Sequence, residues 1–233
     1  MTADDLIARI DYALLRPEIG IPDLVDACDA CKAFRFNSLC VAPWLVESAA
    51  ERLKETGVRL GSVAAFPLGT STLGTKSFET EEAVRNEATL IDIVLPIAKV
   101  ASNDMEGLNL ELTQLRAWVD RFSVGKVELR GILETGYLTP QQMEQAALAL
   151  MEAGWDGVKT STGFGPKGAD PDEVARLSSL LGGRIKVKAA GGIRSAEDML
   201  AMVQAGADLV GTGNGPAIAQ ELREMESRGK LPD

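Results

Sequence analysis

The chain has 233 residues, a formal net charge of −10 and no histidine, and 45% of its residues are hydrophobic. This length suits one large domain, since single α/β barrels commonly contain about 250 residues. The negative charge argues against a nucleic-acid or anionic-membrane partner. The absence of histidine excludes Ser-His-Asp and Cys-His catalytic groups and the commonest zinc ligand. The acidic N-terminus lacks the pattern of a signal peptide, and no apolar run approaches the roughly 20 residues of a membrane span, so we expect a cytoplasmic protein.

Short apolar segments alternate with amphipathic ones along the whole chain. The segments with strand character are 11–15, 38–42, 60–66, 90–96, 127–135, 157–162, 185–190 and 209–213. The segments with helical periodicity are 24–34, 46–56, 80–88, 110–122, 141–154, 171–183 and 196–207. This alternation favours a closed (β/α)8 barrel, or TIM barrel, over an open sheet. Because no linker or change in composition divides the chain, we expect residues 1–233 to form a single domain.

Three cysteines are too few, and odd in number, for a disulfide framework. Cys28 and Cys31 have the CxxC spacing, but they lie inside a helical pattern, without a second pair of cysteines. A redox or zinc site needs a helix N-terminus or further ligands. The pair is therefore predicted to be two buried thiols.

Two lysines, Lys159 and Lys188, each close an apolar segment that has the character of a buried strand. Both are followed by glycines and hydroxyl residues rather than by the charged neighbours of a surface lysine. Burying one ammonium group is costly, and burying two in one barrel raises that cost. The simplest compensation is chemical, because one lysine can lose its proton and become a nucleophilic amine.

Alternation along the strands brings these lysines together with other charged residues. If the aliphatic residues of each strand face the helices, then Asp92, Arg130, Lys159 and Lys188 point into the barrel. Lys186 is also turned inward by this rule, with no evident partner. A structural cluster of ion pairs is the alternative to a catalytic site.

Several longer motifs resemble the deoxyribose-phosphate aldolase family, a family of class I (Schiff-base) aldolases with a (β/α)8 barrel. The matching runs are SLCVAPWLV (38–46), VAAFPLGTSTLGTKSFETEEAV (63–84), IDIVLP (91–96), GILETGYLT (131–139), GVKTSTGFGPKGA (157–169) and KAAGGIRSAEDMLAMVQAGADLVGT (188–212). The motifs KTSTGF and KAxGGIR are specific to the family, and together they are a strong signal. The resemblance covers nearly the whole chain.

The resemblance implies an activity and a role for each matching residue. The reaction is the reversible cleavage of 2-deoxy-D-ribose 5-phosphate to acetaldehyde and D-glyceraldehyde 3-phosphate. Lys159 corresponds to the lysine that forms the imine, Lys188 to the second lysine that perturbs it, and Asp92 to the carboxylate of the proton relay. The residues at or near the phosphate pocket are Gly163, Gly191, Gly192, Arg194 and Gly211. No metal or organic cofactor is implied, since the imine itself is the electron sink. Barrels of this kind are often homodimers, although no exposed apolar stripe marks an interface here.

The chain departs from the family pattern at three places. Tyr12 and Ala13 stand where the family has His and Thr. Arg130 stands where the family has lysine, and arginine keeps the positive charge but cannot shuttle a proton. Gly213 and Asn214 replace two serines that help to hold phosphate. We expect these two residues to line the phosphate site, with backbone N–H groups and the helix N-termini near residues 195 and 215 supplying positive potential.

Some matching residues have two interpretations. Cys40 is either packed in the core or placed at the barrel mouth. Glu134 is expected to orient a neighbour or to pair with a basic group, and Lys76 and Glu79 to form an exposed pair at a helix start. The departures leave two other functions open, a Schiff-base aldolase for a related sugar phosphate or aldehyde, and a non-catalytic barrel that binds phosphate ligands.

Overall fold

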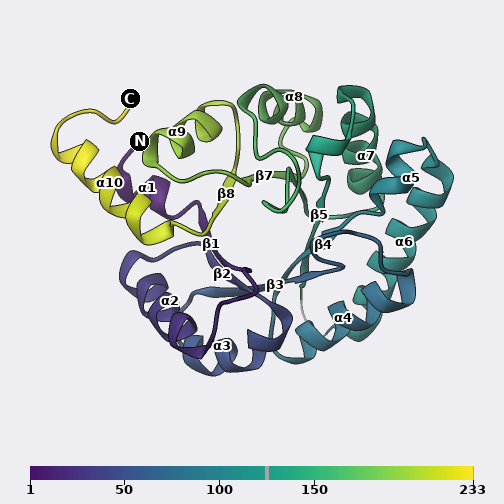
Figure 1. The fold of residues 1–233 in the computed structure, drawn as a ribbon, viewed down its shortest axis with the longest axis horizontal. Helices are drawn as coiled ribbons and strands as arrows, with labels where there is room; N and C mark the ends of the chain where they lie inside the picture. Colours follow the sequence, from purple (N-terminus) through teal and green to yellow (C-terminus); the bar gives the residue numbers. More distant parts are fainter. Residues whose placement is uncertain (124–125, 233) are drawn as a thin grey trace.

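The structure is a computed structural model that describes residues 1–123 and 126–232. Within them, parallel strands close into one barrel in chain order, and helices surround it (Figure 1). The strands are β1 (Ile10–Leu14), β2 (Ser38–Val41), β3 (Arg59–Ala64), β4 (Leu90–Val94), β5 (Glu128–Ile132), β6 (Gly157–Lys159), β7 (Lys186–Ala190) and β8 (Leu209–Thr212). The α-helices are α1 (Ala3–Ile7), α2 (Ile21–Phe34), α3 (Val46–Leu53), α4 (Leu73–Arg85), α5 (Ile97–Ala101), α6 (Met105–Phe122), α7 (Pro140–Glu152), α8 (Pro171–Leu181), α9 (Ala196–Gln204) and α10 (Gly215–Ser227).

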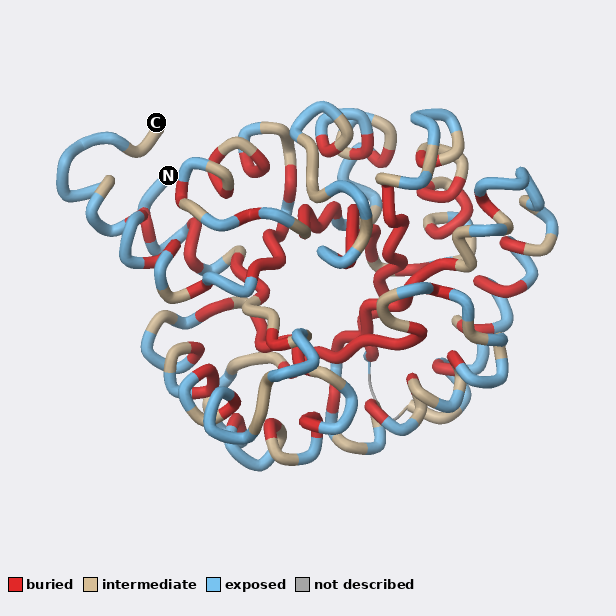
Figure 2. The backbone as a smooth tube through the Cα atoms, in the orientation of Figure 1, coloured by how far each residue is buried: buried red, intermediate tan, exposed pale blue. Residues whose placement is uncertain are grey.

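The barrel closes because β1 pairs with both β2 and β8. Figure 2 shows the strand ring buried and the outer faces of the helices exposed. Aliphatic residues of the strands, such as Ile91 and Ile93, pack outward with the helices in the main core, whereas Asp92 between them is buried inside the barrel. The predicted (β/α)8 barrel is therefore confirmed.

Local signals explain where several helices begin. Ser195 accepts a hydrogen bond from the N–H of Asp198, whose side chain in turn accepts from the N–H of Ser195, so α9 begins with a capping box. Helix α10 begins at Gly215, which confirms both helix starts expected beside the phosphate site. Helices α1 and α5 were not predicted, because five residues are too few to show a helical period.

Two strands are shorter than the sequence predicts by three residues or more. The expected segment 157–162 is a strand only over Gly157–Lys159, and 127–135 only over Glu128–Ile132. After each strand the chain turns into a loop over the barrel mouth. In one of these loops the Thr160 hydroxyl donates to the carbonyl of Ala190 at 3.0 Å, which holds the segment after Lys159 against the end of β7.

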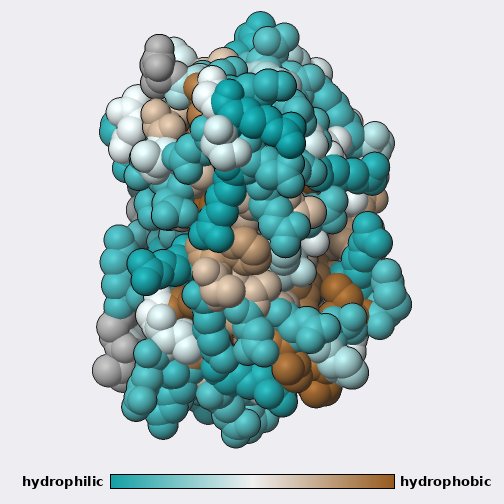
Figure 3. Space-filling view, turned by 90° about the vertical axis from the view of Figure 1, so that its left-hand side faces the viewer, coloured by the Kyte–Doolittle hydropathy of each residue, from teal (hydrophilic) through white to brown (hydrophobic). Residues whose placement is uncertain are grey.

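The outer face shown in Figure 3 is largely hydrophilic, with apolar side chains in a few patches. The N-terminal residues lie beside α10 (Figure 1), and the N–H of Ala3 donates to Glu226 on that helix. No helix in residues 1–123 or 126–232 combines the length and the apolar composition required to cross a membrane.

Candidate active site

Five charged side chains from five strands meet inside the barrel. They are Asp11 (β1), Asp92 (β4), Arg130 (β5), Lys159 (β6) and Lys188 (β7), and each is at most 3% exposed. The strand register accounts for their proximity, because Asp92 lies beside Arg130 across β4 and β5, and Lys159 lies beside Lys188 across β6 and β7. The convergence predicted from strand alternation is thus confirmed, and Asp11 is added to it.

Asp92 is the centre of this cluster. Its Oδ2 accepts hydrogen bonds from Lys159 Nζ at 3.0 Å and Lys188 Nζ at 2.9 Å. Its Oδ1 lies 2.8 Å from Arg130 Nε. Burial by itself would raise the pKa of Asp92, but the charges of Arg130, Lys188 and Lys159 outweigh it and hold the pKa well below its ordinary value. Asp92 is therefore an anion that joins the two lysines through a single oxygen atom.

Asp11 supplies the second carboxylate. Its Oδ2 lies 2.7 Å from Lys188 Nζ and accepts from Arg130 Nη1 at 2.7 Å, while its Oδ1 accepts from Asn37 Nδ2 and Ser38 Oγ, both at 2.6 Å. Burial opposes the charge, but the two cations and these hydrogen bonds hold the pKa of Asp11 far below its ordinary value. Asp11 was not predicted as a site residue. It could have been, because an aspartate within an apolar strand follows the same alternation rule as Asp92.

Lys188 stays charged in this setting. Burial and the neighbouring Arg130 disfavour its ammonium form, but Asp11 and Asp92 outweigh them and raise the pKa of Lys188 above its ordinary value. Among the described residues, Lys188 contacts two carboxylates, those of Asp11 and Asp92, whereas Lys159 contacts one, that of Asp92.

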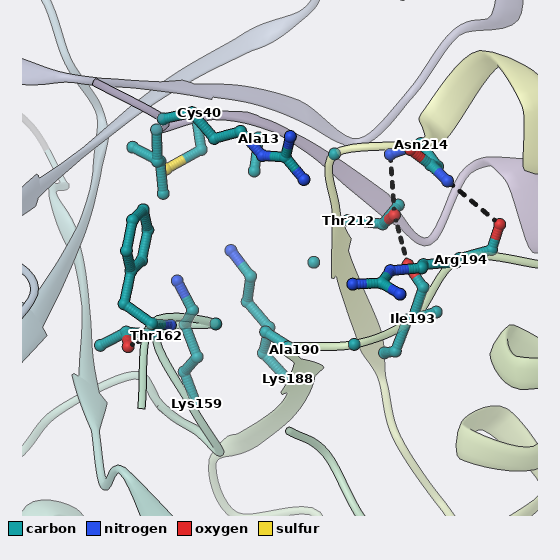
Figure 4. A pocket seen from close by; sticks show the side chains of 18 of the residues that line it. Ala13, Cys40, Lys159, Thr162, Lys188, Ala190, Ile193, Arg194, Thr212 and Asn214 are labelled. Atoms are coloured by element: carbon teal, nitrogen blue, oxygen red, sulfur yellow. Dashed lines mark hydrogen bonds between the residues drawn. The ribbon is translucent and has the colours of Figure 1, made fainter. Parts of the chain in front are cut away.

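A cavity of about 430 Å³ opens above the two lysines at the carboxyl ends of the strands. Lys159 and Lys188 stand side by side in Figure 4, with both amino groups pointing into it. All the residues predicted for the phosphate site line this cavity, namely Gly163, Gly191, Gly192, Arg194, Gly211, Gly213 and Asn214. Ala13, at one of the departures from the family pattern, lines it as well, and Asp92 lies beneath its floor.

Glycine is required at several positions of the cavity wall. Gly163, Gly191 and Gly192 have φ of +88°, +94° and +79°, a backbone conformation that side chains with a Cβ rarely adopt. Gly211 has a different reason, because a Cβ there would lie 2.9 Å from Cε of Lys188. Gly211 thus makes room for the second lysine.

The loops after β7 and β8 are tied together beside the cavity. Thr212 Oγ1 donates to the carbonyl of Ile193 at 2.8 Å and accepts from the N–H of Asn214 at 2.9 Å. The Asn214 side chain donates to the carbonyl of Arg194 at 3.3 Å (Figure 4). The Asn214 side chain, which lines the cavity, thus ties the loop after β8 to the loop after β7.

Lys186 shares the inward side of the barrel with Arg130, as alternation predicts, since a Cβ on the neighbouring Gly157 would meet both side chains, but Lys186 does not reach the cluster. It is exposed at the first position of β7, at the end of the barrel opposite the cavity, and its Nζ lies 3.7 Å from Glu128 Oε2. Strand alternation gives the face of a side chain but not its depth along the barrel axis. At the rim, a long side chain can reach water.

The prediction of an exposed Lys76–Glu79 pair is wrong. Lys76 is buried on α4, where its Nζ donates to Glu111 Oε1 at 2.8 Å and to the carbonyl of Val94 at 3.1 Å. Glu79 accepts the N–H of Ala65 at 2.6 Å. Both residues therefore fix strand ends and loops near the cavity.

Glu134 orients a neighbour, as expected. Its carboxylate accepts hydrogen bonds from the N–H of Thr162, at 3.2 Å, and from the Thr162 hydroxyl. Because Thr162 lines the cavity, Glu134 holds the loop that follows Lys159.

The cysteines are free thiols, and all three are buried. Burial raises the pKa of Cys31 to about 12. The prediction that Cys28 and Cys31 are two buried thiols is confirmed. Cys40 is 1% exposed and yet lines the cavity, so both interpretations of this residue hold. Nowhere in the described part of the chain are three His, Cys, Asp or Glu side chains grouped to hold a metal ion.

Comparison with known proteins agrees with this geometry. A family model described as DeoC/LacD family aldolase matches residues 5–218. A deoxyribose-phosphate aldolase of Thermoanaerobacter sp. (strain X514) is 39% identical over 222 residues, which are 95% of this chain and 99% of that protein. The one of Bacillus subtilis (strain 168) is 38% identical over 211 residues, 91% of this chain and 93% of that protein.

A solved structure gives the same assignment. The deoxyribose phosphate aldolase from Aeropyrum pernix, described as a unique tetrameric structure, has a TM-score of 0.88 and 30% sequence identity. The match covers 96% of this chain and 93% of that one. The chain therefore belongs to the DeoC/LacD family of aldolases, which makes it an aldehyde-lyase, as its motifs predicted.

Proposed function

We propose that this aldolase reversibly cleaves 2-deoxy-D-ribose 5-phosphate to acetaldehyde and D-glyceraldehyde 3-phosphate through an imine on Lys159. One observation carries the proposal: Lys159 and Lys188 share Asp92 Oδ2 at the floor of a cavity large enough for a small phosphorylated sugar. The names of the relatives from Thermoanaerobacter and Bacillus subtilis support this substrate.

The contacts of the cluster favour Lys159 over Lys188 as the nucleophile. Imine formation requires an amine that can reach the substrate aldehyde. Lys188 is held by two carboxylates, those of Asp11 at 2.7 Å and Asp92 at 2.9 Å, and these raise its pKa and keep it an ammonium. Lys159 contacts the carboxylate of Asp92 and lines the cavity, so its amine is the one placed to attack.

The neutral amine then attacks the aldehyde carbon of the substrate. The carbinolamine loses water to give an iminium ion, and the C2–C3 bond breaks as the C3 hydroxyl loses its proton. Glyceraldehyde 3-phosphate leaves, and the two remaining carbons form an enamine whose C2 takes up a proton. Water then releases acetaldehyde and restores the amine.

Lys188 and Asp92 are the groups placed to move these protons. The Lys188 ammonium lies beside Lys159 and can give a proton to the departing hydroxyl of the carbinolamine. Asp92 contacts both nitrogens through one oxygen and so can return a proton between them. Arg130 fixes Asp92 from its other oxygen without taking part in the transfer.

The phosphate end of the substrate would lie over β7 and β8, in the cavity that Lys159 also lines. The glycine loops after these strands bring the backbone to the cavity without side-chain bulk, and α9 and α10 begin just behind them. Helix N-termini attract anions, and this is the usual phosphate site of such barrels. Arg194 adds a positive charge at the same wall.

A coupled assay for glyceraldehyde 3-phosphate, run with 2-deoxyribose 5-phosphate beside ribose 5-phosphate and other sugar phosphates, tests this function. We expect turnover of the deoxy sugar, and its loss by at least about 10³-fold in Lys159→Leu, since the imine carries the reaction. Turnover confined to another sugar would favour the related Schiff-base aldolase, and no turnover of any sugar would favour a phosphate-binding barrel. We also propose a cytoplasmic homodimer, which fractionation and light scattering would test.

A further inference from the structure

A second cavity of about 330 Å³ lies beside the first, over the other side of the barrel mouth. It shares Leu15, Pro17 and Phe164 with the first cavity. Its remaining wall comes from the end of β3, from the loops after β2 and β3 and from helix α4, and the residues are Ala42, Pro43, Val63, Phe66, Pro67 and Glu79. We call this space the apolar compartment. The barrel mouth is thus divided, with glycines and charges over β7 and β8 and hydrocarbon over β2 and β3.

Glu79 is the one charged residue in the wall of the compartment, and its carboxylate is occupied. Its Oε2 accepts the N–H of Ala65 at 2.6 Å. Ala65 has φ of +53°, and its carbonyl accepts the N–H of Gly69 at 2.8 Å. These bonds hold the loop that carries Phe66, so the compartment is already formed without a ligand.

The reactive lysine stands at the border between the two spaces. Lys159 Nζ lies 5.7 Å from the centre of the Phe66 ring. The rings of Phe66 and Phe164 pack edge to face with their centres 5.5 Å apart. Phe66 lines the apolar compartment, and Phe164 lines both spaces. An imine carbon on Lys159 therefore faces charged groups on one side and these aromatic rings on the other.

We propose that the apolar compartment binds the alkyl chain of a substituted donor, an aldehyde R–CH2–CHO in which R is a short aliphatic chain. The inference rests on the proposed function, because it needs the imine on Lys159. The donor condenses with the amine, one water leaves, and loss of a proton from C2 gives an enamine that bears R. That carbon forms the new bond to the carbonyl carbon of the acceptor, whose oxygen takes up a proton, and water then frees the product and the amine.

Geometry assigns R to this compartment rather than to the polar cavity. The acceptor carries the phosphate, so it occupies the side of Gly191, Gly213 and Arg194. The substituent on the donor carbon leaves Lys159 toward the opposite side, where Val63, Phe66 and the prolines offer only hydrocarbon. Each methylene that is buried there is expected to tighten donor binding by about fourfold.

Borohydride trapping with acetaldehyde, propanal, butanal and pentanal tests the inference, with the adduct on Lys159 measured by peptide mass at several donor concentrations. We expect the half-saturating concentration to fall about fourfold for each added methylene until the compartment is full. In Ala42→Leu, which fills the compartment, the ratio of pentanal to acetaldehyde affinity should fall at least tenfold. Ala101→Leu, on an exposed position of α5, is the matched control and should keep the ratio of the parent protein.

The outcomes separate this inference from the proposed function. If acetaldehyde leaves no adduct on Lys159, the imine itself is absent and both fail. If the acetaldehyde adduct forms but affinity stays flat or weakens along the series, the function stands and the compartment does not bind R. An equal ratio in Ala42→Leu and Ala101→Leu, with both variants folded by circular dichroism, would also overturn it. Ala42→Val is the milder substitution if the leucine variant does not fold.

Discussion

Replacing Lys188 by methionine should slow imine formation on Lys159 without unfolding the barrel. The change removes the ammonium group that shares Asp92 Oδ2 with Lys159 Nζ. That ammonium is the group placed to give a proton to the departing hydroxyl of the carbinolamine. Such proton transfer typically contributes about 10²–10⁴-fold to a rate, so we expect imine formation at pH 7 to fall by about 10³-fold.

The rate of adduct formation with acetaldehyde, measured by rapid borohydride quench at pH 7, gives the size of the loss. Lys186→Met is the matched control, because Lys186 lies on the same strand but is exposed at the opposite end of the barrel. The reasoning is refuted if Lys188→Met keeps more than a third of the parent rate, or if Lys186→Met loses as much as Lys188→Met.

Three further predictions concern the same cluster. Asp92→Asn should lower the free energy of unfolding, measured with urea, by about 3–5 kcal/mol, since it leaves buried cations without their carboxylate. The exposed Asp120→Asn should lower it by less than about 0.5 kcal/mol, and equal losses in the two variants would contradict the prediction. Because the pKa values of Asp11 and Asp92 are lowered from 3.8, the stability that they confer is complete above that value and is lost as the pH falls below it. Urea unfolding between pH 5 and 2 should thus show a steep loss that Asp11→Asn makes shallower, and a stability independent of pH would count against it. Gly211→Ala should cost about 1–3 kcal/mol of stability and lower kcat, because its Cβ meets Lys188, whereas Gly74→Ala on α4 has open space and should do neither; identical behaviour of the two variants would show that Gly211 does not position Lys188.

Strand alternation was sufficient to locate most of the cluster from the sequence. Asp92, Lys159 and Lys188 are polar residues inside short apolar strands, and a closed barrel leaves them only its interior. The same rule could not show that Lys186 is exposed at the opposite rim, because alternation gives no information on the position of a residue along the barrel axis.

Contacts between distant segments could not be predicted in this way. Lys76 can be buried because Glu111 on α6 and the carbonyl of Val94 accept hydrogen bonds from its ammonium group. No pattern in the sequence around Lys76 predicts these partners. The division of the mouth into a polar cavity and an apolar compartment is similar, since Ala42, Phe66 and Phe164 belong to three separate loops. These features depend on how the loops pack, which the periodicity of single segments does not encode.

The most direct test is the peptide mass of the protein after borohydride reduction in the presence of acetaldehyde. A Schiff base poised between Asp92 and Lys188 predicts one ethyl group on the peptide that carries Lys159, and none there in Lys159→Leu. Ethyl groups spread over exposed lysines, with the peptide of Lys159 unmodified, would contradict the account.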